Sequence, residues 1–588
     1  MLFRSVTLTL TDGKITGCTA EGKDETPGIG TMALEQLPGA IAESGSIAVD
    51  GVATATITSD AIKEAAAAAL TAAGLNADDY KTAVEAENTK AEDSTIDADV
   101  AIVGAGGAGM TAAITAAAEG KSVVILESQP MVGGNSVRAT GGMNAGKTVY
   151  QDENEFGESA GVEKTLKTAA EKYADNATIT ALAKTVSEQW AAYQADPKGY
   201  FDSVELMELD TMIGGKGLNN PELVETLCSN SADAIDWLDE HGITLHSVSS
   251  FGGASVKRIH RPVDGDGKTV SVGSYMIPLL QENCDKAGVQ TLLNTTATEI
   301  LTDANGAAVG VKATGASGET VTVNAKAVVL ATGGFGANLD MVVEYKPELK
   351  GFMTTNAAGA QGQGIEMATA IGADTVDMDQ IQIHPTVEAN TAALITEGLR
   401  GDGAVLINAE GKRFIDEVGT RDVVSAAEIA QTGSYSWLVV DQAMVDASSV
   451  IQGYIKKGYT VTGETYEELG KAMGVDEAAF AETMNTWNGY VEAKNDPDFG
   501  RTSFANPLNT APYYAIKVTA GVHHTMGGLK INTNTEVLKA DGSVIPGLFA
   551  AGEVTGGVHG ANRLGGNAVA DFTVFGRIAG AAASKYAA

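Results

Sequence analysis

Residues suited to binding an anionic ligand gather near the C-terminus, in residues 521–571. This stretch contains a histidine pair, Glu553, Arg563 and six glycines between positions 552 and 566. Glycine has no Cβ, so its backbone N–H can approach a ligand closely, and positive φ costs it little. We therefore expect a large, partly anionic ligand at this stretch.

A second set of chemical residues lies between positions 384 and 421. His384 stands in IQIHPT, Thr396, Glu397 and Arg400 stand in LITEGLRG, and Arg421 stands in GTRDVV. Only ten of the 39 basic residues are arginine, and three of those ten, Arg400, Arg421 and Arg563, belong to these two sets of chemical residues. Because the chain carries a formal charge of −36, an anionic substrate would need such a local cationic pocket.

Each of these residues has a simpler interpretation when it is taken alone. A single histidine such as His384 is more often a hydrogen-bonded core residue, and one ring of the pair at 523 and 524 could face away from a site. Glu397 and Arg400, three positions apart, could form a surface ion pair worth under about 1 kcal/mol. The seven histidines form no HExxH or Cys/His ligand pattern, so no metal site is expected.

The elements that must position these residues begin near residue 96. An apolar strand leads into Gly104-x-Gly106-x-x-Gly109, an Ala-rich helix follows, and a second strand ends at Glu127. The glycines allow a tight turn and a close pyrophosphate, the helix N-terminus attracts phosphate, and the acid can bind a ribose hydroxyl. This arrangement predicts a dinucleotide-binding unit for FAD or NAD.

Length and composition limit the number of domains and the partners. At 588 residues the chain is too long for one ordinary core, so two or three domains are expected. The acidic charge disfavours nucleic acid and anionic membranes as partners. Residues 100–118 carry no charge, but glycines interrupt them, so we expect a strand, a turn and a helix there and no membrane span.

Further glycine motifs favour FAD over NAD. GGNS at 133–136 and TGG at 140–142 follow the first unit, TGG at 332–334 ends a later strand, and VIPGLFAAGEV lies near the C-terminus. Together these motifs resemble the FAD domain of the fumarate reductase and succinate dehydrogenase flavoproteins. The residues expected to bind FAD non-covalently are Gly104, Gly106, Ala108, Gly109, Glu127, Gly133, Gly134, Asn135, Ser136, Thr140, Gly141, Gly142, Thr332, Gly333, Gly334, Glu553, Leu564, Gly565 and Asn567.

The order of motifs from residue 97 to 586 closely resembles the soluble flavin-dependent fumarate reductases. The resemblance implies that His524 and Arg563 hold one carboxylate of a dicarboxylate substrate. It also implies that His384 and Thr396 hold and twist the other carboxylate. The expected reaction is therefore reduction of the C=C bond of fumarate to succinate.

The same resemblance implies that Arg421 delivers a proton and is resupplied through Arg400 and Glu397. A flavin hydride reduces a C=C bond only if the alkene is polarised and the carbanion-like centre is protonated. Arginine is an unusual acid, because its free pKa lies above about 12. Its proton transfer would therefore have to be concerted with resupply from Glu397.

A separate motif lies in the first 75 residues. Residues 50–59, DGVATATITS, resemble the flavinylation motif of FMN-binding domains, in which a transferase esterifies FMN phosphate onto a threonine. That threonine would be Thr56, although Ala53-Thr54 replaces the more usual Ser-Gly. The alternative is a plain Thr-rich strand that runs into a helix from Asp60 to Ala73, capped by Ser59.

The sequence thus predicts an α/β protein with a Rossmann-like FAD-binding domain, an inserted α+β capping domain and a small α+β FMN-binding domain. The expected ranges are 1–75 for the FMN-binding domain, 76–95 for a linker, 96–378 and 523–588 for the two parts of the FAD-binding domain, and 379–522 for the capping domain. Within the capping domain, residues 403–417 resemble a hairpin.

Several partners follow from this interpretation. FMN would relay electrons to FAD from a donor that the sequence does not identify, and a flavin transferase would attach the FMN. Because the chain begins almost directly with a strand and a turn, we expect an upstream leader to have been removed. A periplasmic or cell-surface location is therefore slightly favoured over the cytoplasm.

Two alternatives to fumarate reduction stay open. The first is reduction of another 2-enoate, such as urocanate, acrylate or a cinnamate-like acid. The resemblance implies that urocanate enzymes carry tyrosine at the position of His384 and aspartate at that of Glu397, so both residues favour fumarate; the loop 387–393 would read substrate shape. The second alternative, from a different class, is a flavin electron carrier without enoate turnover.

Overall fold

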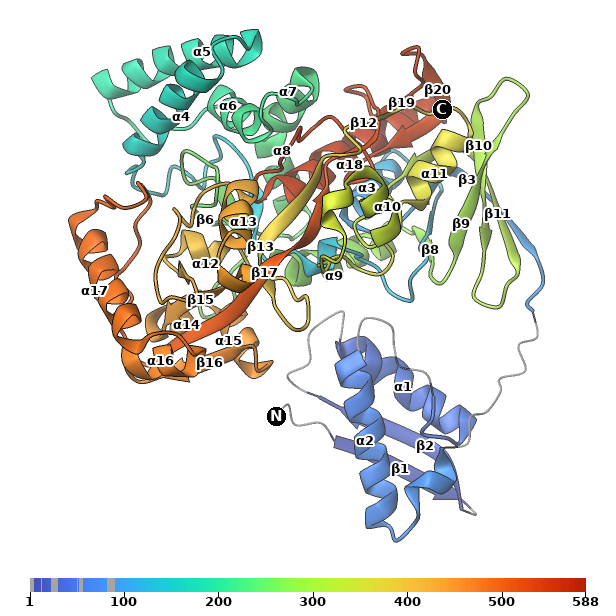
Figure 1. The fold of residues 1–588 in the computed structure, drawn as a ribbon. Coiled ribbons are helices and arrows are strands. Elements are labelled where there is room, and N and C mark those ends of the chain that lie inside the picture. The colour runs from blue at the N-terminus through green and yellow to red at the C-terminus, as the bar shows by residue number, and fades with distance from the viewer. Residues whose placement is uncertain (1–4, 12, 23–29, 50, 52–55, 82–89) are drawn as a thin grey trace.

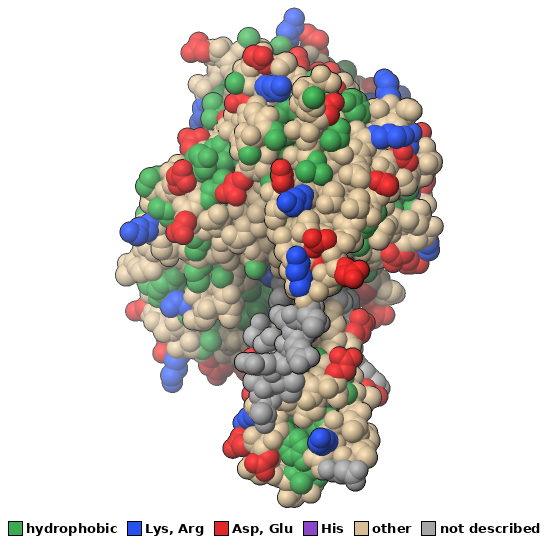
Figure 2. All heavy atoms as spheres, turned by 90° about the vertical axis from the view of Figure 1, so that its right-hand side faces the viewer, with side chains coloured by type: hydrophobic (Ala, Val, Ile, Leu, Met, Phe, Trp, Pro, Cys, Tyr) green, Lys and Arg blue, Asp and Glu red, His purple; other side chains and the backbone are tan. Residues whose placement is uncertain are grey.

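A computed structural model of the chain describes all of its residues except 1–4, 12, 23–29, 50, 52–55 and 82–89. Figure 1 shows a small unit formed by the first 80 residues and a larger body formed by the rest. On the face drawn in Figure 2, acidic side chains are scattered among basic ones. Within the described residues, no helix is both long and apolar enough to cross a membrane.

The small N-terminal unit packs two helices against a hairpin. Its elements are β1 (Ser5–Thr11), β2 (Lys14–Glu21), α1 (Gly30–Ser44), α2 (Thr56–Ala72) and the 3₁₀ turn η1 (Ala77–Tyr80). Leu37, Ile41, Ile62 and Leu70 form the centre of its core. The helix expected from Asp60 begins four residues earlier, at Thr56, so Ser59 is a buried residue inside α2 and not its cap.

The central sheet of the body has parallel strands in the order β20, β11, β3, β4 and β8. The antiparallel β19 extends one edge, and β9 and β10 form a meander with the first half of β11. These strands are β3 (Ser94–Val103), β4 (Val123–Leu126), β8 (Gln290–Leu292), β9 (Thr296–Thr302), β10 (Ala308–Thr314), β11 (Thr320–Leu330), β19 (Glu536–Leu538) and β20 (Val544–Ala550).

Helices α3 and α18 pack together against this sheet. Their small residues allow close approach: a Cβ at Gly580 or Gly576 of α18 would crowd the backbone of α3. The remaining elements of this part are α3 (Gly107–Ala118), η2 (Ser136–Arg138), β5 (Met143–Asn144), β6 (Ser247–Ser249), β7 (Ile259–Arg261), α9 (Val272–Lys286), α10 (Leu339–Tyr345), η3 (Pro347–Leu349), α11 (Gln363–Ala370), β12 (Thr375–Val376), β18 (Gly528–Leu529) and α18 (Asn567–Tyr586).

A helical layer follows β5 in the chain and has its own core around Trp190 and Phe201. It consists of α4 (Ser159–Lys172), α5 (Ala177–Ala195), α6 (Val204–Gly214) and α7 (Pro221–Ser229), and the following α8 (Ser231–Glu240) packs into the core of the central sheet. Asn176, Ser203 and Asn220 cap three of these helices by accepting a backbone N–H, which satisfies donors that a helix start leaves free.

Residues 381–525 form an antiparallel sheet with helices around it, drawn in yellow to orange in Figure 1. Its elements are β13 (Ile381–Glu388), α12 (Gly398–Gly401), β14 (Val405–Ile407), α13 (Arg421–Ile429), η4 (Thr432–Ser434), β15 (Tyr435–Asp441), α14 (Gln442–Ala447), α15 (Ser449–Lys456), β16 (Thr460–Gly463), α16 (Tyr466–Met473), α17 (Glu477–Ala493) and β17 (Tyr513–Thr525). The prediction of a hairpin over 403–417 is wrong. Residues 408–412 do form a turn, but β14 pairs with β15 and not with the residues after the turn. We refer to this segment as the capping segment.

Candidate active site

One large cavity lies at the carboxyl ends of β3 and β4 and reaches into the capping segment. It encloses about 1630 Å³ of space when its open mouth is included. Its lining comes from both stretches that carry chemical residues in the sequence. The tertiary structure therefore joins them into one site.

The glycines at one end of the cavity leave space for a ligand. A Cβ at Gly134 or Gly333 would meet no atom within 4 Å, and both residues have positive φ, +49° and +72°. Gly109 differs, because a Cβ there would overlap the carbonyl oxygen of Gly104 and push α3 off the sheet. Gly134 and Gly333 thus leave open space at the cradle. Gly109, the last glycine of the first motif, permits helix packing, as dinucleotide binding requires.

Glu127 directly follows β4 and lines the same cradle. Its two carboxylate oxygens accept the N–H groups of Ala105 and Gln129, each at 2.8 Å. Burial raises the pKa of Glu127, although these hydrogen bonds oppose the shift. The carboxylate is thus fixed at the cavity wall, where a ribose hydroxyl can reach it.

Most of the residues expected to bind FAD line the cavity. They are Gly104, Gly106, Ala108, Glu127, Gly133, Gly134, Asn135, Ser136, Thr140, Gly141, Gly142, Thr332, Gly333 and Glu553. Five others, Gly109, Gly334, Leu564, Gly565 and Asn567, lie behind its wall. Leu564 packs against Gly214 and Gly253, and Asn567 accepts a hydrogen bond from Asn144 at 2.8 Å, so their side chains support the wall.

Three buried charged residues form a continuous chain at the other end of the cavity. Arg421, the first residue of α13, donates from Nε and Nη2 to Oε2 of Glu397 at 2.9 and 2.7 Å. Oε1 of Glu397 accepts Nη2 of Arg400 at 2.9 Å. The three residues are 6%, 3% and 1% exposed, so Glu397 and Arg400 are not a surface ion pair. Burial would raise the pKa of Glu397, but the two arginines hold it below its usual range.

Gln382 is a member of this network that sequence reasoning did not find. Its Oε1 accepts Nη1 of Arg421 at 2.8 Å, and its Nε2 donates to Oδ1 of Asn562 and to the carbonyl of Arg563, both at 2.7 Å. The sequence did hold a signal for it. Gln382 stands two residues before His384 on β13, and alternate strand residues point to the same face, so both could reach one site.

His384 and Thr396 line the cavity from the capping segment. Nδ1 of His384 accepts the backbone N–H of Thr386 at 3.1 Å, which leaves the proton on Nε2. Burial, with Arg421 nearby, holds the pKa of His384 well below its usual range, so the neutral ring can donate one hydrogen bond. Oγ1 of Thr396 contacts the carbonyl of Thr140 at 3.4 Å and joins the capping segment to the glycine cradle.

Both rings of the histidine pair line the cavity. His523 contacts Oγ1 of Thr355 through Nδ1 at 2.8 Å. Nδ1 of His524 lies 3.4 Å from Oε2 of Glu553, and burial lowers the pKa of His524 to about 4 even though Glu553 opposes this. Glu553 thus lies where it can orient His524 as well as line the proposed flavin site.

Arg563 is a buried cation of the site whose hydrogen-bonding capacity is only partly used. Its Nη1 donates to the carbonyl of Leu564 at 3.0 Å, and its buried Nε has no hydrogen-bond partner among the described residues. Burial and the positive charge of Arg421 lower its pKa to about 9. Arg421 and Arg563 both line this end of the cavity, and fixed cationic donors suit an anionic ligand.

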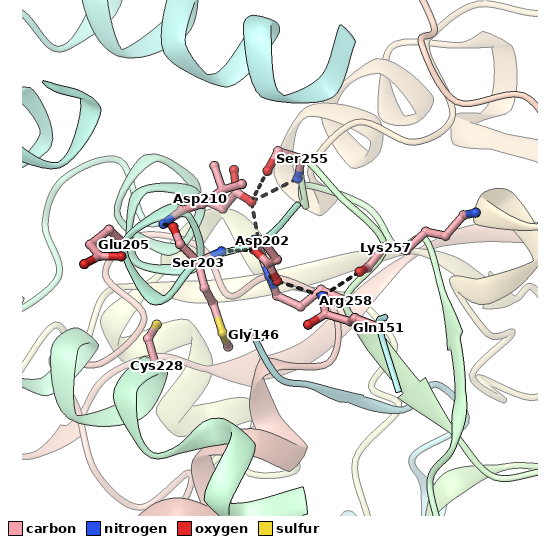
Figure 3. A network of polar contacts seen from close by, with 12 residues as sticks. Gly146, Gln151, Asp202, Ser203, Glu205, Asp210, Cys228, Ser255, Lys257 and Arg258 are labelled. Carbon is pink, nitrogen blue, oxygen red and sulfur yellow. Dashed lines mark hydrogen bonds and ion pairs between the residues drawn. The ribbon is translucent and has the colours of Figure 1, made fainter. Parts of the chain in front are cut away.

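A loop after β6 closes the cavity wall over Glu397. Phe251 lines the cavity, and a Cβ at Gly252 would lie 2.6 Å from Oε1 of Glu397. The loop is anchored at its far end by Arg258, which Figure 3 shows between Asp202 and Asp210. The guanidinium donates to Asp202 at 3.0 and 2.6 Å and to Asp210 at 2.8 Å.

Comparison with known proteins agrees with this architecture. The FAD-binding domain family matches residues 99–196 and 189–569, and the FMN-binding domain family matches residues 4–71. The chain is 41% identical over 558 residues to NADH:fumarate oxidoreductase of Klebsiella pneumoniae, covering 95% of this chain and 54% of that protein. It therefore spans about half the length of that relative.

Other relatives are matched over more of their length. Fumarate reductase (cytochrome) of Shewanella frigidimarina is 42% identical over 83% of this chain and 77% of that protein. Urocanate reductase of Eggerthella lenta is 36% identical over 96% of this chain and 87% of that protein. The open conformation of a flavocytochrome c3 fumarate reductase has 38% identity and a TM-score of 0.63, covering 84% of this chain and 79% of that one.

The fold and the glycine-lined cavity, together with these matches, define a flavoprotein oxidoreductase of the class that acts on CH–CH groups. Within that class, the chain belongs to the FAD-dependent fumarate reductase family and carries an N-terminal FMN-binding domain. The predicted family and fold class are thereby confirmed.

Proposed function

We propose that this protein reduces the C=C bond of fumarate to succinate. The observation that carries the proposal is the buried chain Arg421, Glu397 and Arg400, which opens onto the same cavity as two sets of carboxylate-binding groups. A dicarboxylate has one charged group for each set, whereas a monocarboxylate such as acrylate would leave one set unused.

The residues fit FAD at the glycine end of the cavity, because Gly134 and Gly333 leave a cradle that a Cβ would enter. Gly106 and the N-terminus of α3 would hold the pyrophosphate, and Glu127 would hold a ribose hydroxyl. Bound FAD supplies a hydride to the alkene. The chain's own residues then bind the substrate, polarise it and protonate it.

We assign the polarisation of the substrate C=C bond to the end of the cavity that carries the arginines. Arg563 and His524 bind one carboxylate; both line the cavity, and the hydrogen bonds within the described residues leave part of the Arg563 guanidinium unused. His384 and Thr396 bind the other, with the neutral His384 ring donating through Nε2. Fixed donors in a site shielded from water stabilise the negative charge that develops on the substrate.

Protonation is assigned to Arg421. Its guanidinium is held on two sides, by Glu397 and by Gln382, so its orientation is fixed before the substrate binds. As a proton leaves Arg421 for the substrate carbon, Glu397 passes a proton to Arg421, and Arg400 resupplies Glu397. Concerted transfer keeps Arg421 from becoming a free, neutral guanidine, which the high pKa of arginine would oppose, and Arg400 is the group that must then be reprotonated.

The test is a panel of fumarate, urocanate, acrylate and cinnamate assayed with reduced viologen, which replaces the unknown electron donor. We expect fumarate to have the highest kcat/KM. Arg421→Ala is expected to keep FAD and to lose turnover by at least about 10²-fold, whereas Arg577→Ala, which removes an arginine of α18 outside the cavity, should retain activity. Near-normal turnover of Arg421→Ala would remove the proton-donor assignment.

Urocanate is the second candidate, because a urocanate reductase is 36% identical over 96% of this chain. The neutral His384 ring and Glu397 favour fumarate, as the sequence motifs imply. A higher kcat/KM for urocanate than for fumarate in the same panel would replace the proposal.

For the electron supply, we propose that FMN esterified to Thr56 relays electrons to FAD. Thr56 is the first residue of α2, and its side chain lies outside the described residues. A family match to FMN-binding domains over residues 4–71 supports the proposal. Intact mass after co-expression with a flavin transferase should exceed the chain mass by one FMN moiety, and Thr56→Ala should abolish the difference; a parent chain without the adduct would refute the tether.

A further inference from the structure

The proposed proton relay depends on α12, which is a single helical turn. Glu397 directly precedes this turn, and Arg400 lies within it. A helix of four residues has too few internal hydrogen bonds to be stable on its own, so contacts from outside α12 must hold it in place. A shift of the turn would move the Arg400 guanidinium relative to the Glu397 carboxylate.

Arg501, which lies between α17 and β17, binds the C-terminal side of this turn. Its Nη2 donates to the carbonyl of Arg400 at 2.7 Å, and its Nη1 donates to the carbonyl of Ala404 at 3.2 Å. The last carbonyls of a helix lack partners within it, and Arg501 supplies a charged donor at this end. Arg501 is 2% exposed, so these bonds are shielded from solvent.

Glu417 connects Arg501 to the side chain of Arg400. Its Oε2 accepts Nη1 of Arg501 at 3.1 Å, and its backbone carbonyl accepts Nη1 of Arg400 at 2.5 Å. Glu417 is fully buried, and a buried carboxylate is tolerated only when it is paired. Arg501 thus binds α12 directly and also helps to fix the residue whose carbonyl orients the Arg400 guanidinium.

A second arginine completes this buried network. Arg413 donates to both carboxylate oxygens of Glu417, at 2.7 and 2.8 Å, and to Asp496 at 3.0 Å. The guanidinium groups of Arg413 and Arg501 lie 4.1 and 5.0 Å from the centre of the Trp487 ring. The hydrogen bonds of the Arg413 side chain to described residues go to Glu417 and Asp496, and none goes to α12. The two arginines therefore share an acid and an aromatic neighbour but differ in their contact with the relay.

We propose that Arg501 is a positioning residue of the proton relay, which holds α12 so that Arg400 can supply a proton to Glu397. Arg501 does not line the cavity, so it acts through α12 and not on the substrate. The inference rests on the proposed fumarate reduction, because the relay serves only the proton that completes succinate. Reduction of FAD and binding of a dicarboxylate do not use the relay, so loss of Arg501 should slow one step of the cycle.

The test follows the two halves of the cycle by stopped-flow absorbance. The full chain is expressed without a flavin transferase, so that the absorbance reports FAD. Arg501→Met should keep the parent's rate of FAD reduction by reduced viologen and the parent's Kd for succinate, measured from the change in the FAD spectrum. Reoxidation of the reduced FAD by fumarate should slow about 10- to 100-fold, the range expected for a shift of up to about 1 Å in a catalytic group.

The solvent deuterium isotope effect on this reoxidation should also rise in Arg501→Met, because proton transfer then limits the step. Reoxidation at the parent's rate would overturn the proposal. Parallel losses of FAD reduction, succinate binding and reoxidation would also overturn it, because they would assign Arg501 a general structural role.

Arg413→Met is the matched control. It removes a cation from the same acid and from the same Trp487 ring, but it leaves both bonds from Arg501 to α12. Both variants should lower the denaturation midpoint, whereas reoxidation by fumarate should slow only in Arg501→Met. Equal slowing in both variants would count against the proposal, because the network would then act through overall folding.

Arg501→Lys keeps the positive charge beside Glu417, but its single ammonium group cannot replace the planar fork of donors. Its reoxidation rate should lie between those of Arg501→Met and the parent. This variant stays informative if Arg501→Met does not fold, and the parent's rate and isotope effect in it would contradict the proposal. Failure of the proposed function looks different, because fumarate would then not reoxidise the FAD of the parent protein either.

Discussion

Gly252 offers a direct test of the site, because its missing side chain leaves room for Glu397. A Cβ at this position would lie 2.6 Å from Oε1 of Glu397 and 3.3 Å from the carbonyl oxygen of Gly419. Ordinary contacts begin at 3.4 Å, so Gly252→Ala requires the Glu397 carboxylate to move by about 0.8 Å. The carboxylate cannot turn aside freely, since Arg400 and Arg421 hold it at 2.9 and 2.7 Å.

This displacement gives the expected magnitude. Misplacing a catalytic group by about 1 Å costs on the order of 10²-fold in rate, or about 2.7 kcal/mol of transition-state stabilisation. Gly252→Ala removes no ionisable group and lies behind the cavity wall. We therefore expect kcat for fumarate to fall by about 10²-fold while FAD binding stays normal.

The assay combines kcat and KM with reduced viologen, FAD content by absorbance and a thermal unfolding curve. Gly453→Ala on α15 is the matched control, because its Cβ would meet nothing within 4 Å and alanine in a helix is favoured by up to about 1 kcal/mol. The control should keep full activity. Turnover of Gly252→Ala within about threefold of the parent would refute the close fit around Glu397.

Three further changes probe the support of the site. Gln382→Leu removes an acceptor of Arg421. Because a hydrogen bond to a charged group is worth about 1.5–3 kcal/mol, kcat/KM should fall about 10- to 100-fold. Unchanged kinetics would show that Gln382 does not help to position Arg421. Arg258→Met leaves two buried carboxylates without their cation and should destabilise the protein by about 3–5 kcal/mol, seen as a lower denaturation midpoint; an unchanged midpoint would contradict this. Burial lowers the pKa of His260 from 6.5 to about 4, so the unfolded chain binds this proton more readily. The free energy of unfolding should therefore fall by about 3 kcal/mol as the pH drops from 6.5 to 4. In a plot of the urea midpoint against pH, His260→Gln should flatten this part, and an equally steep plot would exclude His260 as the cause.

Local spacing made part of this protein predictable from its sequence. The glycine motif after β3, the helix behind it and the acid at the end of β4 stand next to one another in the chain, so their geometry follows from short-range rules. The resemblance of the later motifs to the fumarate reductase flavoproteins extended this reading to the whole body. The same rules failed in two places: α2 begins at Thr56 and not at Asp60, and β14 pairs with the distant β15 and not with the residues that follow it.

Burial and long-range contacts were decided by the tertiary structure alone. From the sequence alone, Glu397 and Arg400 could equally have formed a surface ion pair. Only the fold shows that they are buried beside Arg421. The period of β13 placed Gln382 beside His384, but its bond to Arg421 required α13 to pack against that strand. The sequence by itself determined the flavin-binding fold, because its signals are local. The charge network depends on desolvation, and desolvation is set by residues that lie far away in the chain.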